Sequence, residues 1–404
     1  PDTGQFTATC TLRLFSLICK GQSGSVLPGG YARLSTDGLL LQTPQQETAI
    51  PASGPQLVKD VWVMADRGVT TSLLQSSSGA LELSRHSGLV TSRVADHLFW
   101  LGRYNERLNL VCRALRYTVP LLTSFQVTAG QQTDSRALVR FCLQANGTLP
   151  DSAALSSLQQ TSALQQALSE LFSLQHPAGL AQVLKNLLFN AQSVREYFSE
   201  DTWYVLDKLQ LALTQWPNPL NWQQPQQMVR LLDEVILLQT AIYGLNNETM
   251  SRTQTLRFMD LGQHMERALQ SVTLLQEVFV FDQGRNCSAS LMESVLRMTD
   301  TLMTYRRRYK TELHPLAVID LLLLDDSTPR SVGYQCARIQ RQCAKLPQLA
   351  ASTMLSPEQR ISLELVSLLQ LVDPQSLFDH DQQATPALGM LLNQLQHRLL
   401  QVAG

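Results

Sequence analysis

The sequence predicts a mainly α-helical protein, in which a short β-rich segment precedes a large all-helical bundle with an internally repeated helix motif. Ten of the 20 glycines lie in the first 90 of 404 residues, so turn signals are concentrated there. From Ser92 onward, apolar residues recur at steps of three and four, which is the spacing of one helix face. No alternating strand pattern follows residue 91, and this favours a bundle of helices.

The β-rich segment is predicted from two β-prone runs. They span residues 7–19 and 61–64, and Pro28-Gly29-Gly30 forms a turn signal between them. Residues 70–90 are rich in serine, leucine and glycine, which is typical of a linker. We therefore assign the β-rich segment to residues 1–68, a linker to residues 69–90 and the helical domain to residues 91–404.

The first helix of the bundle has a continuous apolar stripe, formed by Val94, Leu98, Leu101, Tyr104, Leu108, Val111 and Leu115. Similar periodicity predicts further helices near residues 132–145, 152–172, 177–197, 199–215, 226–246, 254–279, 289–311, 330–346, 357–371 and 385–402. Glycine and proline separate these segments, and we expect helix breaks at Pro120, Pro177 and Pro329 among others.

Composition excludes several classes of function. The formal net charge is −1, so no broad basic surface for nucleic acid or an anionic membrane is expected. No apolar run reaches the roughly 20 residues of a membrane span. The seven cysteines are scattered without a CxxC pair, which predicts reduced thiols in the cytoplasm. Because the chain begins with Pro1 rather than methionine, we expect it to be a piece of a longer polypeptide.

The most informative feature is a helix sequence that occurs twice. Residues 92–107 read SRVADHLFWLGRYNER, and residues 251–267 read SRTQTLRFMDLGQHMER. In each copy a glycine precedes a glutamate by four residues, Gly102 before Glu106 and Gly262 before Glu266, so the two share a helix face. A helical glycine costs roughly 1 kcal/mol against alanine. Its repetition at the same offset predicts close approach of another backbone beside each glutamate.

Two roles are open for Glu106 and Glu266. We expect the repeated helices to pack as equivalent partners, with the glutamates near each other or near arginines. One role is a buried ion-pair network that fixes the helix register. The other role is catalytic, because a half-buried carboxylate pair can have pKa values suited to proton transfer.

A second cluster, residues 305–309, reads Tyr-Arg-Arg-Arg-Tyr on a predicted helix. Successive helical residues point about 100° apart, so at least one of the three arginines should face inward. They either pair with the repeated glutamates or Asp325 in the core, or form a pocket for an anionic ligand. Asp325 and Asp326 follow four leucines that we expect in the core, and caps are the more common role for such aspartates than metal ligation.

The candidate ligand residues come from the repeated helices and from residues 305–330, namely Arg93, Arg103, Arg107, Arg252, Arg267, Tyr305, Arg306, Arg307, Arg308, Asp325 and Arg330. The sequence has no P-loop, GxGxxG, HExxH or GxSxG motif. Its histidines are dispersed, so no metal site is predicted. We expect His97 and His264 to be packed or surface residues rather than catalytic bases.

The repeated helix resembles the alpha-E family, a bacterial helical domain named for its glutamates. The likeness covers most of residues 91–346. It rests on Trp100-Leu101-Gly102-Arg103-Tyr104 before Glu106-Arg107, on Asp260-Leu261-Gly262 before Glu266-Arg267-Ala268, and on the stretches 304–309, 321–325 and 329–332. The resemblance implies an all-helical domain and leaves its chemistry open.

The chain departs from the family pattern in two places. The family's Arg-Glu-Asn-Ala-Arg run is here Leu188-Phe189-Asn190-Ala191-Gln192. The family's paired arginines after Leu-Gly are here Gln263-His264. If those charges bind a ligand, this copy should bind it weakly or not at all.

Residues 1–66 resemble the tail of a circularly permuted ATP-grasp domain, through Leu12-Arg13-Leu14-Phe15, Val26-Leu27-Pro28-Gly29-Gly30 with Arg33, and Lys59-Asp60-Val61-Trp62-Val63. The family's glycine-rich stretch before Lys-Asp is reduced to Ser53-Gly54-Pro55-Gln56. This piece is too short to bind ATP alone. The resemblance implies a ligase upstream in the same polypeptide that forms amide or peptide bonds through an acyl phosphate, with ATP and magnesium bound only there.

Three functions remain open. The first is a partner domain of that ligase, without a cofactor of its own, which positions a peptide or amino-acid substrate or organises the assembly. The second is an independent enzyme, in which Glu106 and Glu266 transfer protons and Arg306–Arg308 hold an anionic substrate; it predicts a polar, concave pocket containing both glutamates. The third is a scaffold that uses its helical surface for assembly.

Overall fold

The computed structural model describes residues 9–17, 25–35, 57–62, 90–123, 129–148, 160–217, 220–281, 287–310, 312–346 and 354–403. The chain divides into two compact units, Pro1–Arg85 and His86–Gly404. Almost all of the predicted linker, residues 69–90, lies outside the described residues, and its boundaries remain predictions.

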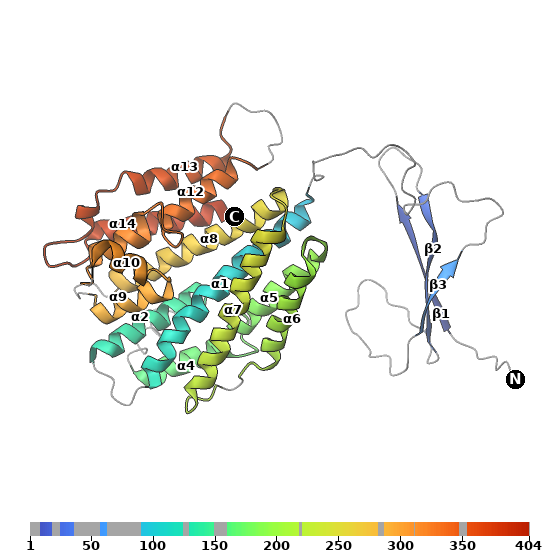
Figure 1. Ribbon diagram of the computed structural model, residues 1–404, viewed down its shortest axis with the longest axis horizontal. Coiled ribbons are helices and arrows are strands. Elements are labelled where there is room, and N and C mark those ends of the chain that lie inside the picture. The colour runs from blue at the N-terminus through green and yellow to red at the C-terminus, as the bar shows by residue number, and fades with distance from the viewer. Residues whose placement is uncertain are drawn as a thin grey trace. The chain divides into compact units, whose positions relative to one another are not determined.

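The first unit contains a three-stranded antiparallel sheet of β1 (Thr9–Leu17), β2 (Ser25–Ser35) and β3 (Leu57–Trp62), with β2 in the middle (Figure 1). The prediction of a turn at Pro28-Gly29-Gly30 was wrong, because these residues lie inside β2. Gly30 pairs with Leu14 on one side and with Val61 on the other. The register of β1 against β2 shifts just after Leu14. Such an irregularity accommodates proline, which cannot donate a ladder hydrogen bond.

The second unit is helical, as predicted. Its elements are α1 (Ser92–Thr123), α2 (Ala129–Ala145), α4 (Thr161–Phe172), α5 (Leu180–Ser193), η1 (Arg195–Tyr197), α6 (Glu200–Thr214), α7 (Pro225–Thr249), α8 (Gln254–Leu275), η2 (Gln276–Val280), α9 (Ala289–Met298), α10 (Leu302–Tyr309), α11 (Pro315–Ile319), η3 (Asp320–Leu324), α12 (Val332–Cys343), α13 (Pro357–Gln370), η4 (Pro374–Leu377) and α14 (Pro386–Ala403). Two of the short segments, η2 and η3, are π-helical.

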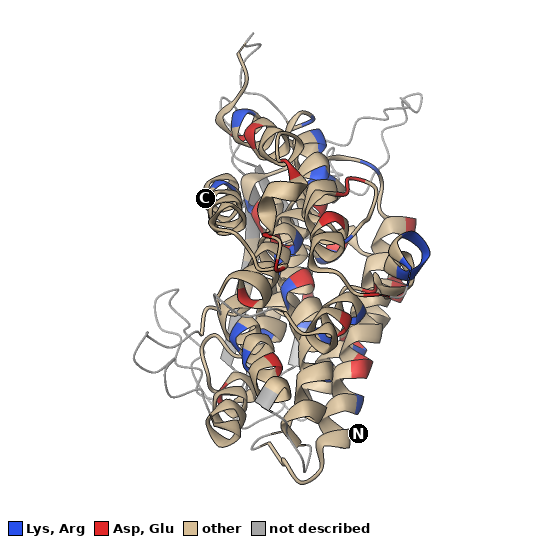
Figure 2. Cartoon of the chain, turned by 90° about the vertical axis from the view of Figure 1, so that its left-hand side faces the viewer, with Lys and Arg blue, Asp and Glu red and all other residues tan. Residues whose placement is uncertain are grey.

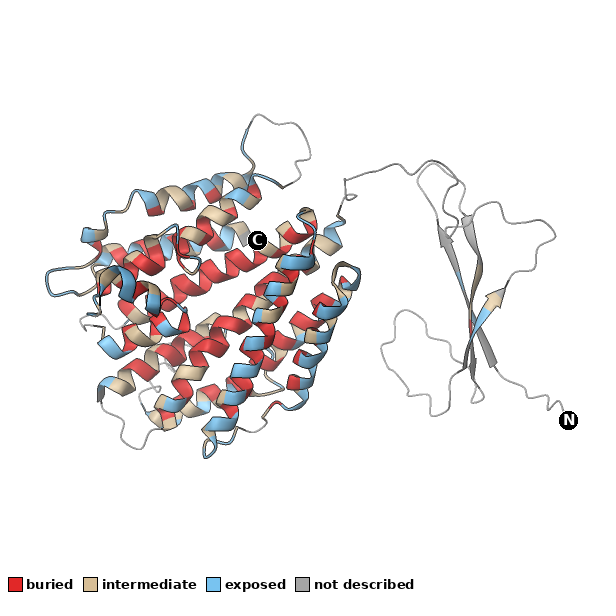
Figure 3. Cartoon of the chain, in the orientation of Figure 1, coloured by how far each residue is buried: buried red, intermediate tan, exposed pale blue. Residues whose placement is uncertain are grey.

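Helices α1 and α8 form the centre of this unit (Figure 1). Helices α2, α5 and α7 pack against α1, whereas α12 and α14 pack against α8. Helix α6 lies outside α7, and α13 lies outside α12 and α14. Figure 3 shows α8 buried along nearly its whole length. Because a helix covered on all sides must also bury its polar residues, those residues need partners inside the protein.

The predicted stripe of α1 faces the core. Its leucines and Val111 are buried, while Val94 and Tyr104 are half-buried. Two helix boundaries were predicted wrongly. Helix α1 continues through Pro120, which cannot donate the helical hydrogen bond to residue 116, and the helix ends three residues later at Thr123. The single helix expected at residues 289–311 is two helices, α9 and α10, separated at Asp300, whose φ is +55°.

Basic and acidic residues are interspersed along the helices (Figure 2). This distribution agrees with the near-zero net charge. None of the described helices combines the length and the apolar character required to cross a bilayer.

Candidate functional site

Helices α1 and α8 touch at a pair of glycines. A Cβ atom placed on Gly102 would lie 2.1 Å from the carbonyl oxygen of Met259 on α8. A Cβ atom placed on Gly262 would lie 2.0 Å from the carbonyl oxygen of Phe99 on α1. Phe99 and Met259 each precede their own helix's glycine by three residues, so the two contacts are related by a pseudo-two-fold axis. The close backbone approach predicted from the repeat is confirmed.

Beside the glycines, each glutamate binds an arginine of the other helix. The Nε of Arg267 donates to Oε1 of Glu106 at 2.8 Å, and its Nη2 donates to Oε2 at 2.6 Å. Arg107 makes the same two-point contact with Glu266, at 2.6 and 3.0 Å. Bidentate pairs of this kind are the strongest hydrogen-bonded ion pairs in proteins. The two Glu-Arg dipeptides therefore exchange partners across the crossing.

Each of the two glutamate carboxylates accepts further hydrogen bonds. The Nε of Arg103 donates to Glu266 at 2.8 Å. The equivalent residue of α8 is Gln263, whose amide makes a longer contact of 3.4 Å with Glu106. Arg330, which lies between η3 and α12, donates to Glu106 at 2.8 Å. Arg330 thus supplies the second positive charge that Gln263 lacks, and each glutamate is bound by two arginines.

The environment keeps Glu106 ionised. Both glutamates are only 2% exposed. Burial acts to raise the pKa of Glu106, but Arg267 and Arg330 outweigh it and lower the pKa to about 2. Burial and the neighbouring Arg267 together lower the pKa of Arg330 to about 10, so Arg330 stays charged at neutral pH. A carboxylate held this acidic is a weak proton acceptor, because a general base works best with a pKa near the operating pH.

Comparison with known proteins identifies a family that shares the Glu-Arg sequence. Residues 90–404 match the family model Alpha-E, described as a predicted alpha-helical domain with a conserved ER motif. This chain belongs to the Alpha-E family. Its relatives include Uncharacterized protein Rv2567 of Mycobacterium tuberculosis and Uncharacterized protein Mb2597 of Mycobacterium bovis, each 28% identical over 338 residues. These alignments cover 79% of this chain but only 37% of each relative. No solved structure matches the chain.

In this Alpha-E chain the Glu-Arg sequence occurs twice, at Glu106-Arg107 and at Glu266-Arg267. Adjacent helical residues point about 100° apart, so the glutamate and the arginine of one dipeptide lie on either side of the contact between α1 and α8. Each glutamate accepts from the other helix, and each arginine donates to it. The reciprocal exchange gives a physical reason for keeping the two residue types adjacent.

His264 lies next to this network on α8. Its Nδ1 is 2.7 Å from Oε1 of Gln335. Burial lowers the pKa of His264 to about 4, and the neighbouring arginines Arg267 and Arg338 act in the same direction. The ring is therefore neutral at pH 7, and His264 is a packed histidine, as predicted.

The structure brings together six of the residues predicted from the sequence, namely Glu106, Glu266, Arg103, Arg107, Arg267 and Arg330. It places the others elsewhere. Arg93 and Arg252 are exposed, and Arg252 donates to the carbonyl oxygen of Asn247 at 2.5 Å. Of the departures from the family pattern on α5, Leu188 is buried and Phe189 is 62% exposed.

The prediction that an arginine of the 305–309 cluster faces inward was wrong. Arg306, Arg307 and Arg308 are all exposed. The buried residues of α10 are Leu302 and Tyr305, and the Tyr305 hydroxyl donates to the carbonyl oxygen of Glu312 at 2.9 Å. Leu302, Tyr305 and the half-buried Tyr309 form the covered face of this eight-residue helix, and the three arginines lie on its other side.

Asp325 is a cap at the end of η3. Its carboxylate accepts from the backbone nitrogen of Ser327 at 2.8 Å and from the hydroxyl of Thr328, and it pairs with Arg308. Burial acts to raise the pKa of Asp325, but these donors outweigh it and hold the pKa well below its usual range. Among the described residues, no group of three or more His, Cys, Asp and Glu side chains is arranged to hold a metal ion.

Sequence reasoning missed a second buried ion pair, between Arg140 on α2 and Glu277 on η2. The Nε of Arg140 donates to Glu277 at 2.7 Å, and the two side chains are 3% and 5% exposed. One signal was available, because Arg136 and Arg140 are four residues apart on α2, where buried leucine, valine and phenylalanine surround Arg140. Its partner Glu277 is 137 residues away in the sequence, so no local pattern indicates the pairing.

Proposed function

We propose that the Alpha-E unit is a partner domain of an ATP-dependent amide ligase, and that it positions a peptide or amino-acid substrate or organises the assembly. The observation that carries this proposal is that the carboxylates of Glu106 and Glu266 are buried and already have hydrogen-bond partners. Each carboxylate is 2% exposed and already accepts hydrogen bonds from two arginines. Groups bound in this way hold two helices together, and the bond-forming chemistry would then belong to another region.

The choice of a ligase rests on the first unit. Residues 1–66 resemble the tail of a circularly permuted ATP-grasp domain, and the β1–β2–β3 sheet lies within them. Leu12 and Leu14 on β1 are 52% and 53% exposed, an apolar surface that a larger domain would cover. The chain spans 37% of the length of its mycobacterial relatives, so those proteins have room for further domains. ATP and magnesium would bind upstream.

The proposed location is the cytoplasm. Cys112, Cys142, Cys287, Cys336 and Cys343 are free thiols. Free and mostly buried thiols are typical of proteins in a reducing compartment.

A scaffold is the second candidate, and one observation favours it. Helices α6 and α7 pack together and expose large apolar side chains. Tyr204, Leu211 and Leu237 are 63%, 56% and 69% exposed. Exposed apolar side chains on neighbouring helices can serve protein association without any ligand.

An independent enzyme has less support from the geometry. The proposed catalytic pair, Glu106 and Glu266, is enclosed by arginines in the core. The proposed substrate-binding arginines are on the surface of α10, and Arg308 is bound to Asp325 there. The two halves of that hypothetical site therefore lie in different environments.

Turnover of ATP tests the proposal. ADP and phosphate would be measured over a panel of amino acids and small peptides, for this chain, for the upstream region of a relative, and for the two joined. Activity that appears only in the joined form supports the partner domain. Activity in the upstream region alone, unchanged when this chain is added, would favour the scaffold instead.

A further inference from the structure

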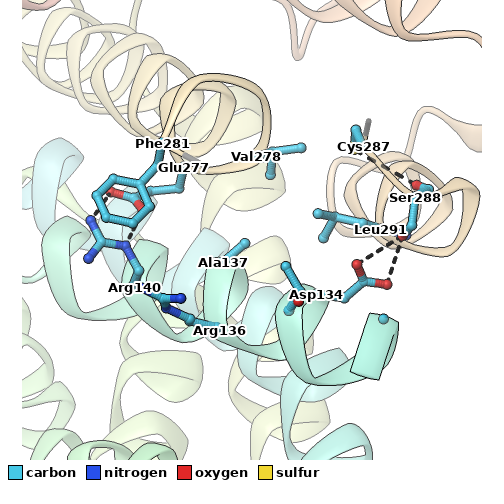
Figure 4. A pocket seen from close by; sticks show the side chains of 12 residues that line it. Asp134, Arg136, Ala137, Arg140, Glu277, Val278, Phe281, Cys287, Ser288 and Leu291 are labelled. Carbon is cyan, nitrogen blue, oxygen red and sulfur yellow. Dashed lines mark hydrogen bonds and ion pairs between the residues drawn. The ribbon is translucent and has the colours of Figure 1, made fainter. Parts of the chain in front are cut away.

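A cavity of about 220 Å³ lies between α2, η2 and the start of α9, away from the α1–α8 glutamates (Figure 4). Arg136, Arg140, Glu277 and Phe281 lie toward one end, and Asp134 with Ser288 lies toward the other (Figure 4). Ala137, Val278 and Leu291 supply apolar walls. A volume of this size exceeds what one or two waters need and is smaller than a typical drug-sized pocket.

The arginine end carries unused hydrogen-bonding capacity. Arg140 is 3% exposed, and Nε and Nη2 face Glu277 at 2.7 and 3.3 Å. Its Nη1 is buried without a hydrogen-bond partner, and the same is true of Nε of Arg136. The ring of Phe281 covers the Arg140 guanidinium, with its centroid 3.2 Å from Cζ. A buried N–H of a charged group without a partner is costly, and it calls for an explanation.

Charge at this end is also unbalanced. Arg136 and Arg140 are four residues apart on one face of α2, a spacing at which like charges repel. Glu277 is the carboxylate that pairs with Arg140, and among the described residues Arg136 has no ion pair. This end of the cavity therefore has two guanidinium groups and one carboxylate. A second anionic group would balance the charge and could accept from Nη1.

The opposite end of the cavity presents a hydrogen-bond acceptor, the carboxylate of Asp134. Asp134 is 6% exposed and is held by the hydroxyls of Ser288 and Ser290. Asp134 and Arg140 are six residues apart on α2, which corresponds to about 9 Å along a helix axis. A ligand of amino-acid size, with an anionic group at one end and a hydrogen-bond donor at the other, matches that span.

We propose that this cavity binds a small organic anion, with a carboxylate or phosphate group on Arg140 and Arg136 and a hydroxyl or ammonium group directed at Asp134. The short apolar body of the ligand packs against Leu291 and Val278. This inference does not rest on the proposed ligase partnership, since it follows from the lining residues alone.

Calorimetric titration of the full chain tests the proposal, with L-glutamate, L-alanine and inorganic phosphate as probes and sodium chloride at matched ionic strength as the reference. We expect at least one probe to bind in the millimolar range or tighter, and chloride to give no saturable heat. Preference for an amino acid assigns the ligand to the carboxylates, and preference for phosphate assigns it to the phosphates. Absence of saturable binding by all three probes would overturn the proposal.

Variants locate the binding. Arg136→Gln removes a half-buried charge that has no ion pair among the described residues, and it should weaken binding by roughly tenfold or more. The double variant R140Q/E277Q removes both charges of the buried pair together, and it should abolish binding. Arg297→Gln, which breaks the exposed pair with Glu293 on the neighbouring α9, is the matched control and should bind as the parent does. If R136Q binds the probe as tightly as R297Q, the ligand is not in this cavity.

Discussion

The glycine crossing makes a sharp prediction for Gly102→Ala. The added Cβ would lie 2.1 Å from the carbonyl oxygen of Met259, whereas an ordinary contact is about 3.5 Å. Helices α1 and α8 would have to separate by roughly 1 Å. Overpacking of this kind costs typically 1–3 kcal/mol, and separation also loosens the ion pairs beside the glycine. The gain in helix propensity, about 1 kcal/mol, offsets only part of that.

The matched control is Gly244→Ala on α7. Nothing lies within 4 Å of a Cβ placed there, and the residue is exposed. This change should therefore stabilise the protein by roughly 0.5–1 kcal/mol, because it removes a helical glycine without a clash. The two substitutions are chemically identical, so opposite signs isolate the effect of the crossing.

Urea unfolding followed by circular dichroism measures both free energies of unfolding. After the gain in helix propensity is subtracted, we expect Gly102→Ala to lose about 1–2 kcal/mol of stability. Gly262→Ala should lose a similar amount, because its Cβ would lie 2.0 Å from the carbonyl oxygen of Phe99. If Gly102→Ala were as stable as the parent or gained stability as Gly244→Ala does, the reasoning about the crossing would be refuted.

Three further predictions concern pH and capping. The pKa of Glu106 in the folded protein, about 2, lies below its ordinary value of 4.5, so the unfolded chain takes up the proton first. About 3 kcal/mol of stability, complete above pH 4.5, should therefore be lost as the pH falls through 2. Acid titration of Glu106→Gln should lack this loss of stability. The folded pKa of His264, about 4, lies below its ordinary 6.5, so stability should fall between pH 6.5 and 4, and the thermal midpoint of His264→Gln should change less over that interval. Ser356 caps α13 in a capping box with Gln359, so Ser356→Ala should cost about 1 kcal/mol in urea unfolding, and an unchanged midpoint would show that the cap contributes nothing.

Much of the helical architecture could be predicted from the sequence. Apolar periodicity located α1, whose Leu98, Leu108 and Leu115 are fully buried. The α1–α8 crossing was predictable for a different reason. Glycine four residues before glutamate, repeated in two helices, is unfavourable unless another backbone approaches, and the contacts at Gly102 and Gly262 are the result.

Other features depend on contacts between distant residues. Arg330 reaches Glu106 across 224 residues of sequence, and no local pattern indicates which arginine compensates for Gln263. Arg306–Arg308 were expected to include an inward arginine, but that outcome depends on which face of the short α10 is covered by other elements. The β2 strand runs through Pro28-Gly29-Gly30 because its two neighbours supply pairing that a local turn signal does not reveal.

We infer that the reciprocal Glu-Arg pairs hold α1 and α8 together. A double-mutant cycle at Glu106 and Arg267 tests it most directly, with free energies of unfolding for Glu106→Gln, Arg267→Gln and the double variant. Removing one partner leaves a buried charge and should cost roughly 3–5 kcal/mol, whereas removing both should cost much less. Arg330 also loses its partner when Glu106 is replaced, but its side chain is 21% exposed and can reach solvent. We expect a coupling energy of about 2 kcal/mol or more, with the double variant more stable than Glu106→Gln alone. Effects that add to within about 0.5 kcal/mol would contradict it.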